Sequence, residues 1–246
     1  MSAIWLSGAE AFCPAAASLP IAHVQRVVDG DTLRLTDGRN VRMIGLNTPE
    51  TGKKGRSAEP FAEAAKSVCK HWWTKAAGRS AACRSAGQGP LRPHVGHVYG
   101  RDGDNLEAQL LSEGLGYLVA VAPNVALVDC QQSAEREARQ ARRGVWRNSP
   151  VQPSDKLRKS GFAMVSGKVR SVQRNRGGIW IELHGSLVLR VAPDQASRFD
   201  MAALERLKGR QIETRGWVVD RSGRGGLKAG QSRWMIALSH PAMLSF

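Results

Sequence analysis

Three short runs of alternating apolar residues, separated by two Asp-Gly turns, constrain the fold of this chain more than any other feature. Val24–Val28 precedes Asp29-Gly30, and Leu33–Leu35 follows it. Asp37-Gly38 then leads into Val41–Leu46. Alternation with a period of two is typical of strands, and Asp-Gly favours tight connections between them. The pattern therefore predicts an antiparallel meander whose last two strands form a hairpin.

Polar residues gather where this meander turns and ends. Asp31 begins the second strand, Arg42 lies on the third, and Asn47, Thr48 and Glu50 follow it. A hard cation such as Ca²⁺ binds carboxylate, amide and backbone carbonyl oxygens, which Asp31, Asn47 and Thr48 would supply. Glu50 would hold or deprotonate a water, and Arg42 would pair with phosphate oxygens as a planar fork. The alternative is ordinary turn chemistry, because the same residue types are common turn formers.

Later motifs continue in a recognisable order. The chain reads Leu-Leu-Ser-Glu-Gly-Leu at Leu110–Leu115, then Ala-Glu-Arg-Glu-Ala-Arg at Ala134–Arg139, and Gly-Val-Trp at Gly144–Trp146. Together with the two earlier polar runs, residues 22–147 resemble the staphylococcal nuclease-like (thermonuclease) family. This resemblance implies a five-stranded OB-type barrel with helices. It also implies calcium-dependent hydrolysis of phosphodiester bonds in DNA and RNA, as an endonuclease would perform it.

The resemblance also implies a role for each polar residue. Those on the metal-ligand positions are Asp31, Asn47 and Thr48, with Asp29 supporting them from behind. Glu50 falls on the general base and Arg42 on the first phosphate-binding arginine. Family members usually have aspartate where this chain has Asn47, so the metal site carries one negative charge fewer. We therefore expect a lower affinity for the metal.

A second departure concerns the other catalytic arginine. Family members usually carry Asp-Arg-Tyr-Gly-Arg before the strand that here begins near Val95, whereas this chain has Gly-Pro-Leu-Arg-Pro at Gly89–Pro93. Pro93 falls on the arginine position, and Arg92 is the candidate replacement. A shift of one residue in a strand reverses the face to which a side chain points. Losing one such donor costs roughly a hundred- to a thousand-fold in rate. Two alternatives therefore stay open: a nucleic-acid-binding protein without turnover, and a protein-interaction scaffold.

The charge of the chain favours a polyanionic partner. Its 246 residues carry a formal net charge of +15, with a pI near 10.5. Residues 1–150 account for +5 and residues 151–246 for +10. Clustered lysine and arginine bind nucleic acid by neutralising phosphates, so we expect DNA or RNA as partner. A basic surface kept for solubility is the alternative.

A polar, proline-rich break at Arg147–Ser154 divides the chain. We expect a tail at 1–21, a nuclease-like domain at 22–147, a linker at 148–160 and a second domain at 161–246. Helices are expected at 59–73, 106–112 and 127–143. After the break, strand-like runs lie at 163–172, 179–183, 187–191, 211–219 and 234–238, with helical runs between the third and fourth. An OB-fold places its helix there. The predicted fold class is thus mainly β with helices (α+β), two OB-like barrels in series.

Basic residues in the second domain lie near tryptophans. The candidate nucleic-acid-binding residues are Arg174, Arg176, Arg221, Arg224 and Lys228, near Trp180, Trp217 and Trp234. Aromatic platforms in a positive groove suit single-stranded nucleic acid. Tryptophan in a strand is more often part of the core, so core packing is the alternative for each of the three.

The four cysteines are Cys13, Cys69, Cys83 and Cys130. Four cysteines allow three pairings, and spacing does not choose among them. Related bacterial chains are similar in placing one cysteine before the first strand and another at the closing helix, which implies a bond between Cys13 and Cys130. We expect Cys69 and Cys83 to be buried or free.

The location of the protein in the cell is not fixed by the sequence. A disulfide favours an exported or periplasmic location. Residues 1–12, however, lack the positive start and continuous apolar core of a signal peptide. No apolar run is long enough to span a bilayer. We expect a monomer that uses no small-molecule cofactor beyond the metal.

Overall fold

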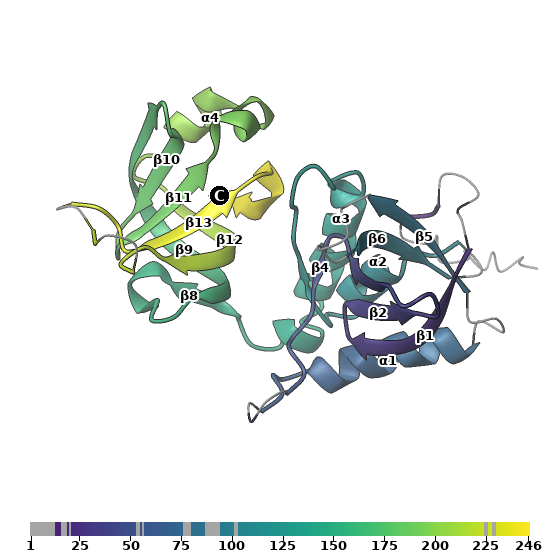
Figure 1. Ribbon diagram of the computed structural model, residues 1–246. Coiled ribbons are helices and arrows are strands. Elements are labelled where there is room, and N and C mark those ends of the chain that lie inside the picture. The colour runs from purple at the N-terminus through teal and green to yellow at the C-terminus, as the bar shows by residue number, and fades with distance from the viewer. Residues whose placement is uncertain are drawn as a thin grey trace, which may run out of the picture. The chain divides into compact units, whose positions relative to one another are not determined.

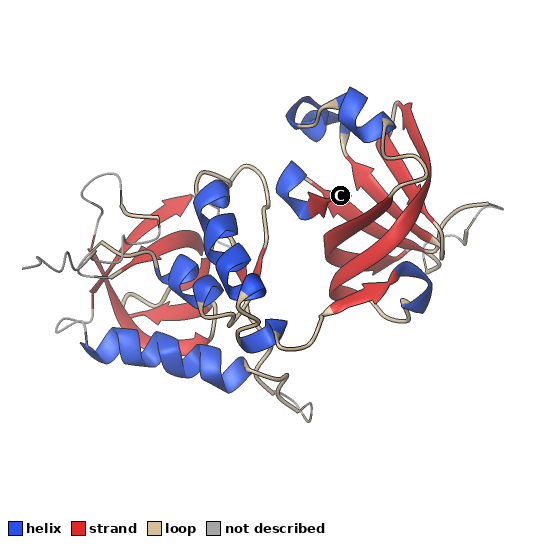
Figure 2. Cartoon of the chain, turned by 180° about the vertical axis from the view of Figure 1, so that it is seen from behind, coloured by secondary structure: helices blue, strands red, loops and turns tan. Residues whose placement is uncertain are grey.

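A computed structural model describes residues 13–15, 19, 21–52, 55, 57–75, 80–86, 94–100, 103–223, 226–227 and 230–246. The chain divides into two compact units. The first comprises residues up to Leu118 together with Ala126–Arg147, and the second comprises Val119–Val125 together with Asn148–Phe246. Each unit is built on one curled sheet with short helices around it (Figures 1 and 2).

Five strands of the first unit close into a barrel in the order β1-β2-β3-β6-β5. These strands are β1 (Ile21–Asp29), β2 (Thr32–Leu35), β3 (Asn40–Met43), β5 (Ser80–Ala86) and β6 (His94–Tyr99). The predicted hairpin is confirmed, because β2 and β3 pair antiparallel with Thr32 opposite Arg42. β3 runs parallel to β6, and β5 pairs with both β6 and β1. Alternate residues such as Leu33 and Val41 are buried inside the barrel.

Among the described residues, three α-helices complete the first unit, close to where the sequence predicts them. They are α1 (Ala62–Lys75), α2 (Leu106–Ser112) and α3 (Val128–Gln140). Figure 1 shows α1 lying along β1 and β2. A short strand pair, β4 (Leu46–Asn47) with β7 (Tyr117–Leu118), follows the meander, and a 3₁₀ turn at Gly144–Trp146 ends the unit. Leu46 and Leu118 are fully buried, which fixes the start of the segment that carries Asn47 and Thr48.

The cysteines tie the ends of the first unit together. Cys13 and Cys130 form a disulfide with their Cα atoms 5.6 Å apart, and Cys130 lies on α3. Cys69 is a free thiol, buried on α1. The side chain of Cys83 lies outside the described part of the chain. The disulfide thus attaches the segment before β1 to the closing helix.

The second unit repeats the strand order of the first. Its strands are β8 (Val151–Pro153), β9 (Gly161–Asn175), β10 (Gly178–Leu183), β11 (Leu187–Val191), β12 (Gln211–Asp220), β13 (Trp234–Leu238) and β14 (Leu244–Ser245). Neighbours run β9-β10-β11-β13-β12, with β11 parallel to β13, and β12 pairs back onto β9. α4 (Met201–Glu205) lies between β11 and β12, as an OB-like fold requires. The predicted fold class is confirmed: mainly β with helices, with a closed barrel and a second, curled OB-like sheet.

Two short segments join the second unit without a periodic signal in the sequence. β8 lies inside the expected linker at 148–160 and pairs parallel with β9, Val151 opposite Met164. Val119–Val125 also belongs to this unit, where the backbone of Ala122 donates to Ser239 Oγ at 3.1 Å. Strands of two or three residues are too short to show alternation. No helix among the described residues is long and apolar enough to cross a membrane.

Candidate active site

The turn between β1 and β2 fits tightly under α1. A Cβ at Gly30 would lie 2.7 Å from Ala65 Cβ and 2.8 Å from Thr48 Oγ1. The Cys69 thiol donates to the carbonyl of Gly30 at 3.2 Å, and burial raises the pKa of that thiol. Glycine lets the backbone approach the helix this closely, since it has no side chain to displace. The turn is therefore held where it presents Asp31 to the segment at Thr48.

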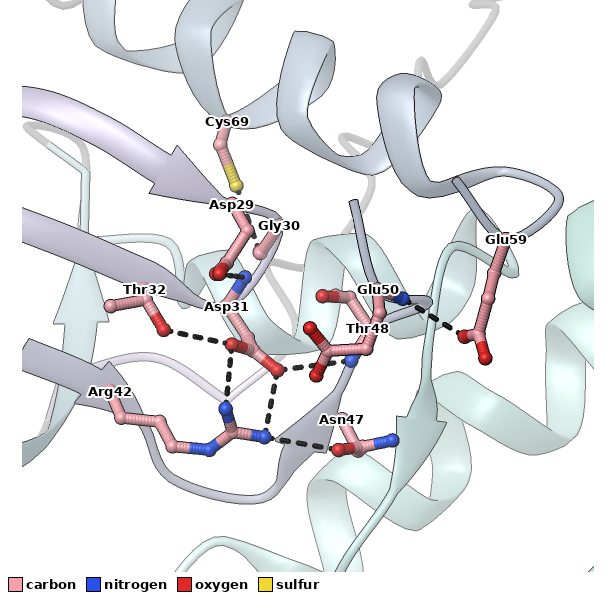
Figure 3. Close-up of polar contacts among 10 residues, drawn as sticks. All are labelled: Asp29, Gly30, Asp31, Thr32, Arg42, Asn47, Thr48, Glu50, Glu59 and Cys69. Carbon is pink, nitrogen blue, oxygen red and sulfur yellow. Dashed lines mark hydrogen bonds and ion pairs between the residues drawn. The ribbon is translucent and has the colours of Figure 1, made fainter. Parts of the chain in front are cut away.

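Asp31 lies at the centre of the site and is only 3% exposed. Its Oδ1 accepts hydrogen bonds from Thr32 Oγ1 and Arg42 Nη1, both at 3.0 Å. Its Oδ2 accepts from the backbone of Thr48 at 3.1 Å, and Arg42 Nη2 lies 3.0 Å away (Figure 3). Burial raises the pKa of Asp31 to about 6, against the opposing effects of the Arg42 charge and the Thr48 hydrogen bond. Asp29 lies behind it and accepts the backbone N–H of Asp31 at 3.4 Å.

Arg42 joins Asp31 to Asn47. Its side chain projects from β3 opposite the start of β2, where Thr32 is its partner in the sheet. Besides contacting both oxygens of Asp31, its Nη2 donates to Asn47 Oδ1 at 3.0 Å (Figure 3). The side chain remains 33% exposed, so Arg42 is in contact with solvent. An anion can therefore approach Arg42 from outside.

Glu50 stands at the solvent edge of the site. Its backbone N–H donates to Glu59 Oε2 at 2.9 Å, and the backbone of Glu59 donates back to the Glu50 carbonyl at 3.0 Å. Figure 3 shows the Glu50 side chain extending toward Asp31, while Glu59 lies on the other side of the Glu50 backbone. The two reciprocal bonds fix the backbone of Glu50 and leave its carboxylate exposed.

The structure brings most of the sequence-derived candidates together. Asp31, Arg42, Asn47 and Thr48 are linked by hydrogen bonds, with Glu50 beside them. Arg92 lies outside the described residues, as does Pro93. Sequence reasoning missed two supporting residues, Glu59 and Cys69. Glu59 precedes the proline that starts the predicted helix, which is an ordinary position for an acidic residue. Its place in the sequence therefore does not indicate that it holds the Glu50 backbone.

The donor set of this site suits a hard divalent cation. Asp31 is a carboxylate, Asn47 offers an amide oxygen and Thr48 a backbone carbonyl, with the Glu50 carboxylate beside them. Within the described residues, no three His, Cys, Asp or Glu side chains gather as a conventional metal site. Arg42 contacts the same oxygens of Asp31 and Asn47 that a cation would use. A cation bound at these atoms would therefore compete with the Arg42 guanidinium.

The structure describes three of the five candidate nucleic-acid-binding residues of the second unit. Arg174 and Arg176 are exposed at the end of β9 and in the turn after it. Arg221 is half-buried, whereas Arg224 and Lys228 lie outside the described residues. The three tryptophans differ: Trp234 is 5% exposed, Trp217 is 41% exposed, and Trp180 is intermediate.

Comparisons with known proteins point to one family. The family profile described as "Staphylococcal nuclease homologue" matches residues 40–148. The SPbeta prophage-derived endonuclease YokF of Bacillus subtilis is 29% identical over 137 residues, which cover 50% of this chain and 43% of that protein. The thermonuclease of Staphylococcus hyicus is 29% identical over 128 residues (51% of this chain, 75% of that protein). The thermonuclease of Staphylococcus intermedius is 30% identical over 126 residues (50% and 74%). With its barrel and its matching polar runs, this chain belongs to the staphylococcal nuclease-like family.

Proposed function

We propose that this protein is a metal-dependent nuclease that hydrolyses phosphodiester bonds in DNA, RNA or both. The observation that carries the proposal is the set of hydrogen bonds that links Arg42 to Asp31, Arg42 to Asn47 and Thr48 to Asp31. These residues come from three segments of a chain that belongs to a nuclease family. Carboxylate and neutral oxygens beside a guanidinium are the groups that phosphodiester hydrolysis needs.

The metal of this proposal is Ca²⁺, held by the Asp31 carboxylate, the Asn47 amide oxygen and the Thr48 carbonyl. When bound, the cation supplies positive charge that offsets the charge developing on the phosphate oxygens. Calcium accepts mixed carboxylate, amide and carbonyl ligands, whereas softer metals favour nitrogen and sulfur. Because Asn47 is neutral, we expect weaker binding than a site with aspartate there would have.

Arg42 exchanges partners in this proposal. In the structure both Nη atoms donate to Asp31, and Nη2 also donates to Asn47. A phosphate that approaches Arg42 from solvent offers two oxygens in the same fork geometry as a carboxylate. The guanidinium can then leave Asp31 and Asn47 for the phosphate. This exchange would free the carboxylate of Asp31 and the amide oxygen of Asn47 for the cation.

Glu50 is the proposed general base. Its carboxylate is exposed, and the Glu59 contact fixes its backbone. Glu50 takes a proton from a water as the water oxygen attacks phosphorus, and the phosphorus–oxygen bond to the leaving sugar breaks. The leaving oxygen takes a proton from solvent. Removing a general base of this kind costs about a hundred- to ten-thousand-fold in rate.

The second candidate function is nucleic-acid binding without turnover. The observation that favours it is Pro93 in place of an expected arginine, together with Arg42 held by Asp31 and Asn47. A phosphate with one guanidinium instead of two receives less charge stabilisation in the transition state.

Cleavage of labelled single-stranded DNA and RNA, with calcium and with chelator, tests the two candidates. We expect calcium-dependent cutting by the native chain and its loss in Asp31→Ala. The control is Asp37→Ala, because Asp37 is exposed and pairs with Arg39 at a surface turn. No cutting by the native chain, with salt-sensitive binding intact, would exclude the nuclease and support the binding protein.

A further inference from the structure

Trp180 on β10 is surrounded by cationic side chains. Arg190 on β11 lies directly opposite it in the sheet, with its Cζ 5.4 Å from the indole centroid. The Cζ of Arg221, which follows β12, lies 5.8 Å from the same centroid. Guanidinium groups within about 6 Å of a ring are attracted to its face. One tryptophan therefore contacts two arginines from separate segments of the chain.

Trp180 is not a core residue. Its neighbours Ile179 and Ile181 are 0% exposed and lie inside the sheet, so Trp180 points to the outer face. β10 and β11 are the second and third strands of this OB-like sheet. In OB folds the outer face of these two strands, with the adjoining loops, binds oligonucleotides and oligosaccharides. The tryptophan thus stands on the surface that such folds use for ligands.

Hydrogen bonds hold this arrangement in place. The indole Nε1 donates to Asn175 Oδ1 at 3.0 Å, and the backbone of Gly177 donates to the same oxygen at 2.8 Å. Arg190 Nε donates to the Gly177 carbonyl at 3.1 Å. The turn between β9 and β10 thereby fixes both the ring and the guanidinium. A rigid aromatic surface loses little conformational entropy when a ligand stacks on it.

The charges around Trp180 favour an anion. Arg176 is exposed in the turn that precedes β10, and Arg174, opposite Ile179 at the end of β9, is exposed as well. Two carboxylates of the neighbouring strands are paired with arginines: Glu182 contacts Arg170 at 2.6 Å, and Asp220 contacts Arg233 at 2.7 Å. Arg190 and Arg221 place two positive charges at the ring, which favours an anion there.

A hollow lies next to this surface. It has a volume of about 290 Å³, and its lining includes Arg170, His184, Gln231 and Ser232. Arg221 connects the two, because its Nη1 donates to the Ser232 carbonyl at 3.1 Å while its Cζ lies near Trp180. The hollow is close to the lower size of known small-ligand pockets, about 300 Å³.

We propose that the outer face of β10 and β11 binds single-stranded nucleic acid, with Trp180 as the stacking platform. A base stacks on Trp180, Arg190 and Arg221 contact the phosphates on either side, and the hollow receives the next nucleotide. Stacking on an aromatic ring accepts any base, so the surface binds without strong sequence preference. This proposal rests on the proposed function, because it assigns a binding surface for the same substrate class.

Binding of fluorescein-labelled oligo-dT and oligo-U to the full chain, measured by anisotropy in chelator, tests this surface apart from cleavage. We expect Trp180→Ala to weaken binding by roughly 5- to 150-fold, the range for one lost base stack. The control is Trp217→Ala, since Trp217 is exposed on β12 and packs edge-on against Phe162. We expect that variant to bind within about twofold of the native chain, because its ring lies outside the proposed surface.

Three results overturn the proposal: native affinity in Trp180→Ala, a preference for duplex over single strands, or no binding by the native chain. If Trp180→Ala does not fold, Arg221→Gln decides in its place, with a loss of fivefold or more expected from the missing phosphate contact. Failure here is distinguishable from failure of the proposed nuclease. If Trp180 does not contribute to binding, calcium-dependent cutting by the first unit can still be measured separately. If Asp31→Ala abolishes cutting, we expect binding at the Trp180 surface to remain intact.

Discussion

At the scale of single residues, Asn47 sets the charge of the proposed metal site. Its Oδ1 accepts from Arg42 Nη2 at 3.0 Å, so it already faces a cation. Asn47→Asp keeps the oxygen and adds one negative charge. We expect calcium affinity to rise about tenfold or more, because ligand charge largely sets the affinity of such sites. Isothermal titration with calcium checks this, and unchanged affinity would show that residue 47 does not contact the ion.

Gly30 controls the distance between the β1–β2 turn and α1. A methyl group there would clash with Ala65 Cβ at 2.7 Å and with Thr48 Oγ1 at 2.8 Å. We expect Gly30→Ala to lower the free energy of unfolding by about 1–3 kcal/mol, the usual cost of overpacking. Urea unfolding measures it against Gly223→Ala, where nothing lies within 4 Å. Equal stability of the two variants would contradict the packing described.

Glu107 is a buried carboxyl away from the active site. It is 0% exposed, accepts the backbone N–H of Val98 at 3.0 Å and Asn105 Nδ2 at 2.6 Å, and lies 3.4 Å from His97 Nδ1. Burial raises its pKa above the ordinary value, against the opposing effect of His97. A carboxyl whose pKa is raised in the folded state stabilises the protein at pH values below its pKa in the unfolded chain, about 4.3. This contribution is lost as pH rises through the folded-state pKa.

We therefore expect the unfolding free energy of the native chain to decrease with rising pH above about 4.3 more steeply than that of Glu107→Gln. Urea unfolding at a series of pH values gives the slopes. Glu63→Gln is the matched control, because Glu63 is exposed in the first turn of α1. Parallel slopes for the native chain and Glu107→Gln would show that this carboxyl titrates normally.

At the scale of elements, the sequence predicted strands and helices where an element is long enough to show a periodic pattern. β9 to β13 lie within a few residues of the predicted runs, as do α1 to α3, because each spans several periods. β4, β7 and β8 have two or three residues and no period to detect. The sequence also did not predict the hydrogen-bond partners of Arg42. A hairpin places Arg42 near Asp31 but does not determine which oxygens its side chain contacts.

The disulfide is the element-scale feature with the largest expected effect on stability. It joins residues 117 apart in sequence, and cross-linking a loop of this length reduces the entropy of the unfolded chain. We expect Cys130→Ser to lower the unfolding free energy by about 2–5 kcal/mol. Cys13→Ser should lower the unfolding free energy by the same amount, since both variants open the same loop. A loss in only one of the two would indicate an effect other than the cross-link.

At the scale of the whole molecule, the two units share one strand order but have different proposed roles. The first places carboxylates and Arg42 together, whereas residues 151–246 carry +10 of the net charge of +15. The sequence predicted the first barrel through the family resemblance and the second through five strand-like runs. It did not reveal that Val119–Val125 belongs to the second unit, because that assignment depends on tertiary contacts such as the bond to Ser239.

The most direct test of the proposed active site compares Glu50→Gln with the native chain at saturating calcium, measuring both cleavage rate and calcium affinity. We predict a rate at least about a hundredfold lower, because the general base is lost. Calcium affinity should stay within about tenfold, since Asp31, Asn47 and Thr48 remain. Glu50→Gln cutting at the native rate would contradict the account, because the water would then be activated elsewhere.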